Sequence, residues 1–246
     1  MKKRKSSKVD KIYAEPIVNL QDFEFNAQVA NVFQDMLERS IPGYFFMLEL
    51  VKLLTGRFAK PNTNIYDLGC SLGETIKHTY ASLPSNCQVI GVEKSLPMVE
   101  KCIANLESIK SKENIVIRHE DLLDTKIENA SLVIMNLTLQ FIPPEDRDAV
   151  LKKIANGLMD DGLLILFEKV NFEDADEQSF LNRLYSDFKL ANGYSKLEIT
   201  QKRQALENVL IPDTIPKIKK RVKRSGFRKI ELISQCLNFS GLIAMK

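Results

Sequence analysis

The strongest constraint on the fold is a regular alternation of short apolar strands and helical segments that begins after residue 60. The pattern predicts strands at residues 64–68, 87–93, 115–119, 130–136 and 163–168, of which the second is short and buried. Helices are predicted over residues 74–82, 95–110 and 144–159. Strands joined through helices run parallel, and the helices then cover both faces of the sheet. The sequence therefore predicts an α/β fold built on a mainly parallel sheet.

Two further strands, near residues 229–235 and 239–245, are separated only by residues 236–238. So short a connection cannot make a parallel crossover, which needs about a dozen residues or more. The two strands should therefore pair as an antiparallel hairpin. We expect a seven-stranded, mainly parallel sheet with one antiparallel strand at its edge.

Helical segments outside this alternating pattern complete the predicted domain. Residues 12–246 should form a single α/β domain, with N-terminal helices within 12–60 and a helical insertion at 171–210. These two additions are the natural candidates for a lid and a substrate pocket. Residues 1–11 are basic and are expected to form a disordered tail.

Composition excludes several classes of protein. With 246 residues, 44% of them hydrophobic and 27% charged, the chain can bury a substantial core and is too apolar to be disordered. No stretch approaches the roughly 20 apolar residues that cross a bilayer, and the basic start is not followed by the apolar region of a signal peptide. We therefore expect a cytoplasmic protein. Its four cysteines form no Cys-x-x-Cys pair and its two histidines lie in unrelated segments, so we expect no metal and no disulfide framework.

The formal net charge is only +3, but basic residues gather at the N-terminus and in a helix predicted near residues 217–224. Surfaces of this kind can face RNA. Neither group contains interleaved aromatic residues, however. A solvated tail and a charged helix face are therefore the favoured interpretation.

The clearest sign of a ligand site is the segment at residues 67–73, Asp-Leu-Gly-Cys-Ser-Leu-Gly, at the end of the first predicted strand. Gly69 and Gly73 permit a tight turn and a close approach of the backbone to a ligand. Glu93 ends the second strand, about 20 residues or more later, where an acid binds ribose hydroxyls. A glycine turn alone is weak evidence, but the turn and the acid together indicate a nucleotide-type site.

The residues around this turn favour S-adenosyl-L-methionine (SAM) over a dinucleotide. Asp67 would repel a pyrophosphate but suits the ammonium group that SAM carries. Asp121 follows the third strand, where its side chain could accept a hydrogen bond from the adenine amino group. Asn136 ends the fourth strand and could face the methionine portion. For Asp121 and Asn136, capping of a strand end is the alternative.

These motifs resemble a known family. The chain is similar to class I SAM-dependent methyltransferases, which have a Rossmann-like fold, and in particular to the carboxy-S-adenosyl-L-methionine (carboxy-SAM) synthase family. The resemblance extends over nearly the whole chain from residue 12, and its most specific parts surround Tyr44 and Arg203. The matching segments are residues 14–17, 32–36, 39–44, 66–73, 136–141, 191–195, 201–203 and 206–209.

The resemblance implies a reaction in which SAM and prephenate give carboxy-SAM and phenylpyruvate, for modification of a tRNA wobble uridine. It also implies a homodimer, while no direct binding of tRNA is expected. Glu93 stands where the family usually has aspartate, and the position of Lys94 need not be charged. The implied cofactor-binding residues are Tyr44, Gly69, Cys70, Ser71, Glu93, Lys94, Asp121, Leu122, Asn136 and Arg203.

Arg203 and Tyr44 are the expected catalytic residues. A guanidinium gains nothing beside the sulfonium of SAM, because like charges repel, but it can bind the carboxylate of carboxy-SAM through two parallel hydrogen bonds. Tyr44 offers an aromatic face and a hydroxyl near the reacting carbon, or else it packs in the core. Two other functions share the glycine turn: a conventional methyltransferase acting on a small molecule or RNA, and a non-catalytic SAM-binding module.

Overall fold

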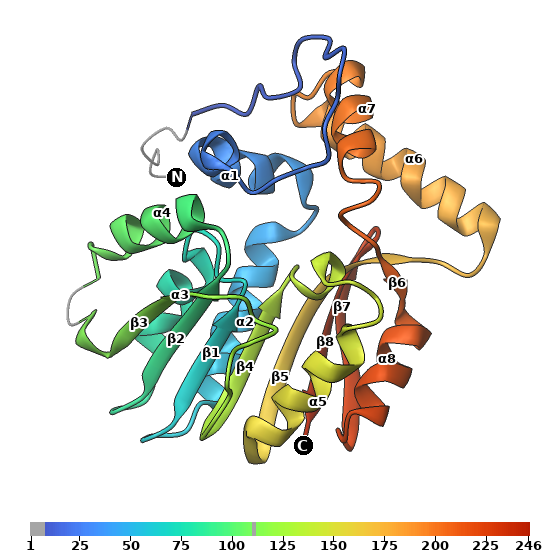
Figure 1. Cartoon of the computed structure of the whole chain (residues 1–246). Helices are drawn as coiled ribbons and strands as arrows, with labels where there is room; N and C mark the ends of the chain where they lie inside the picture. The colour runs from blue at the N-terminus through green and yellow to red at the C-terminus, as the bar shows by residue number, and fades with distance from the viewer. Residues whose placement is uncertain (1–7, 110–111) are drawn as a thin grey trace.

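The computed structural model describes residues 8–109 and 112–246, and these form one mixed sheet with helices on both faces (Figure 1). The parallel strands are β1 (Asn64–Leu68), β2 (Gln88–Glu93), β3 (Ile115–His119), β4 (Ala130–Asn136) and β5 (Leu158–Asn171). An antiparallel pair follows, β7 (Lys229–Cys236) and β8 (Phe239–Met245). The strand order is β3-β2-β1-β4-β5-β8-β7, and the short β6 (Asp213–Thr214) pairs with the end of β5.

This architecture confirms the predicted Rossmann-like α/β class, with one difference at the edge of the sheet. The reversed strand is β8, which pairs with β5 on one side and with β7 on the other, so that β7 forms the edge. Most residues of β8 are buried, whereas β7 is largely exposed. The more apolar strand of the hairpin, β8, therefore lies inside the sheet. The short connection predicted the hairpin but not which of its two strands forms the edge.

Helices cover both faces of the sheet. One face is covered by α2 (Tyr44–Phe58), α3 (Glu74–Thr79) and α4 (Leu96–Leu106), and the other by α5 (Arg147–Gly157) and α8 (Ile215–Arg224). Ile65 and Ile134 point to the first face, and Tyr66 and Met135 to the second. Because side chains alternate along a strand, strands that are apolar at every position feed two cores at once.

The ends of the helices follow local signals. Ser95 caps α4, since its hydroxyl accepts a hydrogen bond from the Met98 N–H, and a proline stands in the first turn. The predicted helix over residues 74–82 is α3 followed by a short 3₁₀ helix, η1 (Tyr80–Ser82). The other 3₁₀ helices among the described residues are η2 (Lys112–Asn114) and η3 (Leu139–Phe141).

A further layer lies over the carboxyl ends of the parallel strands, where the N-terminal segment meets the insertion (Figure 1). Its helices are α1 (Ala27–Ser40), α6 (Ala175–Ala191) and α7 (Lys196–Ala205). The N-terminal segment wraps around α7: the side chain of Gln201 donates to the carbonyls of Tyr13 and Glu15 at 3.0 and 2.8 Å. The Phe23 N–H donates to the carbonyl of Ala205 at 2.8 Å. The two additions that the sequence set apart therefore build one structure.

The ordered chain begins earlier than predicted. Residues 1–7 of the expected disordered tail lie outside the described residues, but Asp10 is buried. Its carboxylate accepts a hydrogen bond from the Tyr194 hydroxyl at 2.7 Å, and its N–H donates to the carboxylate of Asp35 at 2.7 Å. The prediction is therefore wrong for Asp10, because its partner on the helical insertion lies 184 residues away.

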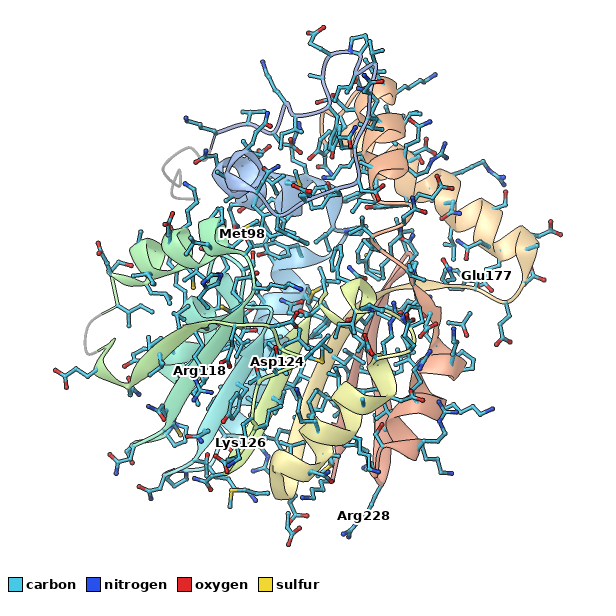
Figure 2. All side chains as sticks on the ribbon, in the orientation of Figure 1. Met98, Arg118, Asp124, Lys126, Glu177 and Arg228 are labelled. Carbon is cyan, nitrogen blue, oxygen red and sulfur yellow. The ribbon has the colours of Figure 1, made fainter. Side chains whose placement is uncertain are left out.

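Charged side chains cover the surface. Lys126, Glu177 and Arg228 project outward, whereas Met98 is buried in a cluster with residues of α1 (Figure 2). No helix within the described parts of the chain is long and apolar enough to cross a membrane.

Part of the basic charge on α8 is neutralised within the chain. Arg221 pairs with both Asp148 and Asp213, and Arg224 also pairs with Asp148. Asp213 in turn binds the buried Arg147 at 3.0 Å. These ion pairs tie α8 to α5 and β6, so the basic side chains of this helix help to hold the fold.

Candidate active site

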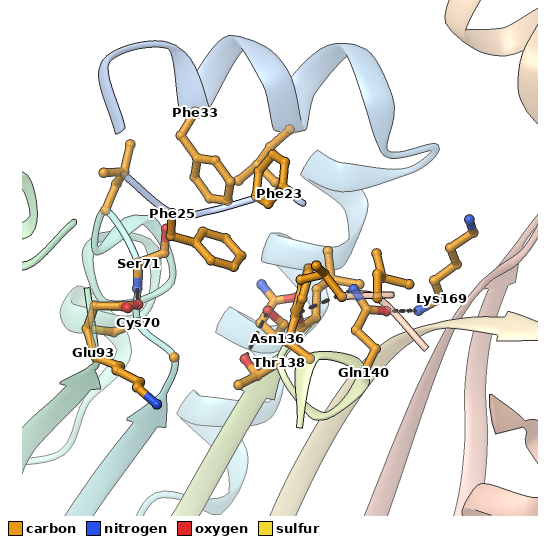
Figure 3. Close-up of a pocket in the computed structure, with 18 of the residues that line it drawn as sticks. Phe23, Phe25, Phe33, Cys70, Ser71, Glu93, Asn136, Thr138, Gln140 and Lys169 are labelled. Atoms are coloured by element: carbon orange, nitrogen blue, oxygen red, sulfur yellow. Dashed lines mark hydrogen bonds between the residues drawn. The ribbon is translucent and has the colours of Figure 1, made fainter. Parts of the chain in front are cut away.

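A cavity of about 510 Å³ opens at the carboxyl ends of β1, β2 and β4, beneath α1 and the N-terminal segment. In Figure 3, Ser71 and Glu93 lie at one end of it and Lys169 at the other. This edge of a parallel sheet is where open α/β folds bind their ligands. The residues of the predicted site that line it are Tyr44, Gly69, Cys70, Ser71, Glu93, Lys94, Asp121, Leu122 and Asn136.

The glycine turn has the backbone shape that its sequence indicates. Gly69 has a φ of +77°, and Ser71 has a φ of +50°. A Cβ atom on Gly69 would lie 2.6 Å from Cγ2 of Thr138, so a side chain there would force the turn or Thr138 to shift. The N–H groups of Gly69 and Cys70 both donate to the carbonyl of Val92, at 2.8 and 3.0 Å, and anchor the turn to β2.

Glu93 ends β2 and is held by backbone groups on two sides. Its Oε2 accepts a hydrogen bond from the Ser71 N–H at 3.0 Å, and its Oε1 accepts one from the Ser95 N–H at 2.9 Å. Burial raises the pKa of Glu93, while these N–H groups act in the opposite direction. The carboxylate thus joins the glycine turn to the start of α4 and fixes one wall of the cavity.

Asp67 lies on β1, directly before the glycine turn, and is buried. Neither of its carboxylate oxygens has a hydrogen-bond partner among the described residues. Burial, together with the charge of Glu93, raises the pKa of Asp67 to about 7. A cation placed nearby would stabilise the ionised form. Asp67 is not among the residues that line the cavity, so its role toward the ammonium group of SAM stays a prediction.

Asp121 and Lys94 form an ion pair beside the same end of the cavity, with 2.7 Å between Lys94 Nζ and Asp121 Oδ2. Burial opposes ionisation of Asp121, but the bonds from Lys94 and from the Leu123 N–H outweigh it and lower the pKa of this carboxyl group. Asp121 is therefore ionised and able to accept a hydrogen bond from an exocyclic amine. Leu122 adds an apolar contact next to it.

Asn136 and Tyr44 also line the cavity. The Nδ2 of Asn136 donates to Oγ1 of Thr75 at 3.3 Å, whereas its buried Oδ1 has no partner in the described residues. Tyr44 is the first residue of α2 and is 5% exposed. The open Oδ1 acceptor fits a ligand that brings an N–H donor.

Aromatic side chains that the sequence did not single out form the roof of the cavity (Figure 3). The ring of Phe25 packs edge-on against those of Phe23, Phe33 and Phe141, with centroids 5.2, 5.8 and 5.1 Å apart. The density of phenylalanine in residues 23–33 was a signal, but a buried core gives the same pattern. The roof makes the N-terminal segment part of the pocket wall, as predicted.

Arg203 stands apart from the other predicted residues. It lies on α7, its side chain is exposed, and it does not line the cavity of its own chain. Its neighbour Lys202 does. Next to α7 in sequence, α6 buries none of its residues, and its Phe180 is 53% exposed.

The far end of the cavity is lined by Lys169, Tyr185 and Lys202, which the sequence argument missed. These residues come from β5, α6 and α7, and no spacing along the chain connects them. One weak signal was available, since Lys169 directly follows the strand predicted at 163–168. The carboxyl end of a parallel strand is a common place for a functional side chain.

The arrangement fits SAM. Acidic and hydrogen-bonding groups at the glycine end can hold an adenosyl group and an ammonium, and the basic end can receive an anionic second substrate. Within the described part of the chain, no group of three or more His, Cys, Asp or Glu side chains could hold a metal ion.

Comparison with known proteins agrees with this geometry. Residues 65–162 match the model of a methyltransferase domain. The chain is 48% identical to a carboxy-S-adenosyl-L-methionine synthase of Shewanella sp. (strain ANA-3) over 238 residues, which are 96% of this chain and 98% of that protein. It is 47% identical to one from Aliivibrio fischeri (strain ATCC 700601 / ES114), with the same coverage. A third, from Photorhabdus laumondii, is 43% identical over 96% of this chain and 94% of its own length.

Solved structures share the fold at low sequence identity. A putative O-methyltransferase from Nostoc punctiforme superimposes with a TM-score of 0.65 at 14% identity, over 89% of this chain and 59% of that one. Human N-acetylserotonin methyltransferase, solved in complex with SAM, gives a TM-score of 0.60 at 16% identity, over 89% of this chain and 55% of that one.

Proposed function

The chain belongs to the carboxy-SAM synthase family, and from this premise we propose that it transfers a carboxyl group from prephenate to the methyl carbon of SAM. The products are carboxy-SAM and phenylpyruvate, and carboxy-SAM supplies the oxyacetyl group of a tRNA wobble uridine. The observation that carries the proposal is the 48% identity, over 96% of the chain, to a carboxy-SAM synthase. The chain is a SAM-utilising transferase; a cytoplasmic location stays a prediction from its sequence.

The adenosyl group belongs at the acidic end of the cavity. Glu93 would bind ribose hydroxyls, and Asp121 would accept a hydrogen bond from the adenine amino group. The turn from Gly69 to Ser71 would contact the methionine portion, with the open Oδ1 of Asn136 accepting from its ammonium. The assignment of Asn136 uses an acceptor that the described residues leave open, and that of Asp121 uses a carboxylate that they hold ionised.

The proposed reaction balances without a base from the protein. Prephenate loses its ring carboxyl group as carbon dioxide and its hydroxyl group as hydroxide, and so becomes phenylpyruvate. The hydroxide takes up the proton that the methyl carbon of SAM loses, which gives water, and that carbon forms a bond to carbon dioxide. The protein has to hold the two substrates together and exclude bulk water, which the aromatic roof supports.

We assign Arg203 to the new carboxylate and expect it to act across a homodimer interface. Its exposed position keeps it out of the cavity of its own chain. The neighbouring α6 leaves Phe180 and Leu184 exposed and buries no residue, as expected of a helix that packs against a second copy. In such a dimer, Arg203 of one subunit would enter the cavity of the other.

Mixing two variants tests the assignment to the partner subunit. Arg203→Leu and Gly69→Ala should each be nearly inactive alone. If Arg203 acts across the interface, a heterodimer of the two contains one intact site, and carboxy-SAM formation returns after subunit exchange. Exchange without any return of activity would place Arg203 in its own subunit's site and contradict this assignment.

The overall reaction is tested with purified enzyme, SAM and prephenate, followed by mass spectrometry. We expect a cofactor product heavier by one carboxyl group, together with equimolar phenylpyruvate. A conventional methyltransferase would instead give S-adenosylhomocysteine and a methylated acceptor. Formation of S-adenosylhomocysteine and a methylated acceptor, with no carboxylated cofactor, would contradict the proposal.

A further inference from the structure

Three lysines converge on the end of the cavity opposite the glycine turn. Lys169 follows the buried part of β5, Lys189 lies on α6 and Lys202 on α7. The Nζ atoms of Lys169 and Lys189 lie 5.2 and 4.2 Å from the centroid of the Tyr185 ring. Lys202 Nζ donates to Oγ of Ser40 at 3.2 Å. Lys169, Tyr185 and Lys202 line the cavity, and Lys189 lies behind them against the same ring.

The positive charge at this end is only partly balanced. Lys202 has a carboxylate at 3.8 Å, that of Asp10. Within the described residues, no carboxylate forms an ion pair with Lys169 or Lys189. Burial lowers the pKa of Lys189 to about 7, and the charges of Lys169, Lys202 and Arg203 act in the same direction. The free protein therefore holds like charges together at a cost, which a bound anion would remove.

The acid nearest in sequence does not serve this cluster. Glu168 precedes Lys169, and because side chains alternate along a strand it points to the opposite side of β5. Its carboxylate accepts hydrogen bonds from the N–H groups of Leu139 and Gln140, at 2.9 and 2.7 Å. Glu168 therefore does not pair with these lysines, and beyond Asp10 beside Lys202 a ligand has to supply the negative charge.

This inference rests on the proposed function and names the part of the substrate that the lysines hold. We propose that Lys169 and Lys202, reinforced by Lys189, bind the carboxylate that prephenate retains when it becomes phenylpyruvate. Lys169 and Lys202 contact this carboxylate, and Lys189 acts through its charge behind the Tyr185 ring.

The chemistry decides between the two carboxylates of prephenate. The ring carboxylate leaves as neutral carbon dioxide, so a lysine beside it would stabilise the ground state more than the transition state and would slow the reaction. The side-chain carboxylate keeps its charge throughout. Cations at the far end therefore hold prephenate by the group that does not react and leave its ring free to face the methyl carbon of SAM.

Replacing Lys169 tests the subsite. We expect Lys169→Met to raise the KM for prephenate about 10- to 100-fold, as for loss of a charge-assisted hydrogen bond, while SAM affinity stays unchanged. Inhibition by phenylpyruvate, competitive with prephenate, should weaken by the same factor, because phenylpyruvate contains only the retained carboxylate. Lys169→Arg keeps the charge and should stay within a few-fold of wild type. Lys189→Met should give a smaller rise in KM.

Controls separate the subsite from general damage. Lys152→Met removes an exposed lysine of α5, outside this cavity, and should leave every constant unchanged. Unchanged SAM affinity in Lys169→Met shows that the variant is folded. If its KM for prephenate rises while phenylpyruvate inhibits as strongly as before, Lys169 holds the departing carboxylate and the assignment is overturned. Unchanged values for both ligands overturn the subsite altogether.

Binding without turnover keeps this inference distinct from the proposed function. Phenylpyruvate is titrated calorimetrically into SAM-loaded wild type and into SAM-loaded Lys169→Met. If prephenate is not converted but phenylpyruvate binds wild type more tightly than the variant, the reaction is wrong and the anion subsite stands. If carboxy-SAM forms and the two proteins bind phenylpyruvate equally, the subsite is wrong and the reaction stands.

Discussion

The two ends of the cavity differ in whether their charged side chains have partners within the protein. At the glycine end, the carboxylates of Glu93 and Asp121 already have partners, from backbone N–H groups and from Lys94. At the far end, Lys169 and Lys189 lie against an aromatic ring with no acid paired to them within the described residues. The first end is preorganised by the protein itself. The second is complete only when an anion binds.

The difference follows from where the residues come from. The sheet and its turns supply the glycine end, which the chain shares with other methyltransferase folds. The far end combines the last part of β5 with α6, α7 and the N-terminal segment. The elements of the common fold thus form the end that we assign to SAM, and the added segments help to supply the lysines that we assign to prephenate.

The largest effect expected at the glycine end comes from Gly69→Ala. Alanine at a φ of +77° is strained, and its Cβ would lie 2.6 Å from Cγ2 of Thr138, so the turn or Thr138, which also lines the cavity, has to move. A displacement of about 1 Å costs on the order of 100-fold, and we expect such a loss in SAM affinity, measured by calorimetry. Gly56→Ala is the matched control, because its Cβ would meet only Ser82, at an ordinary 3.5 Å. SAM bound equally well by both variants would contradict the role of the turn.

Arg203→Leu tests how the new carboxylate of carboxy-SAM is bound. Losing charge-assisted hydrogen bonds of roughly 1.5 to 3 kcal/mol should weaken carboxy-SAM about 10- to 100-fold, while SAM affinity stays the same. Competition between the two ligands in native mass spectrometry measures the ratio directly. Equal weakening of SAM and carboxy-SAM would remove the assigned role of Arg203.

Ligand affinity should depend on pH at the basic end of the cavity and not at the glycine end. In the free enzyme, burial lowers the pKa of Lys189 to about 7 and that of Lys202 to about 8. A bound carboxylate raises both values, so binding takes up protons and affinity falls as pH rises through this range. We expect the KM for prephenate to rise about tenfold between about pH 7 and about pH 9.

A neutral ligand of the other end provides the control for this pH effect. 5′-Methylthioadenosine has no group that titrates in the same range and lacks the ammonium group that would favour ionised Asp67, so its affinity should not change with pH. Lys189→Met should also reduce the slope for prephenate. A KM for prephenate that is independent of pH in the wild-type enzyme would contradict the lysine titration.

The smallest effect should come from Lys94→Met. The Lys94 side chain is 78% exposed, and exposed ion pairs contribute at most about 1 kcal/mol, so SAM affinity should fall by no more than about fivefold. Asp121→Ala is the comparison, since it also removes the proposed adenine acceptor and should cost more. A larger loss for Lys94→Met than for Asp121→Ala would show that the lysine itself contacts the ligand.

Local sequence patterns predicted one end of the cavity and not the other. The glycine turn and Asp121 each follow a strand, Glu93 and Asn136 each end one, and parallel strands bring their carboxyl ends to one edge. Their meeting could therefore be predicted once the strands were identified. The resemblance to a family added Tyr44, which also lines the cavity.

The basic end could not be predicted in this way. Lys169, Lys189 and Lys202 stand on separate elements, and their approach depends on how the insertion folds back over the sheet. Periodicity identifies that insertion as helical but does not give its direction. Asp10 was misplaced for the same reason, because its only local feature is a basic, polar surrounding, and Tyr194 fixes it from far along the chain.

The bond between Asp10 and Tyr194 also has a consequence for the order of assembly. Asp10 is synthesised early, but its partners on the insertion and on α7 emerge from the ribosome only near the end of translation. A growing chain can pair β1 with β2 and close the glycine turn long before the far end of the cavity exists. Binding of nucleoside should accordingly precede catalytic competence while the chain is being synthesised, and Asp10 should be among the last residues to reach its final contacts.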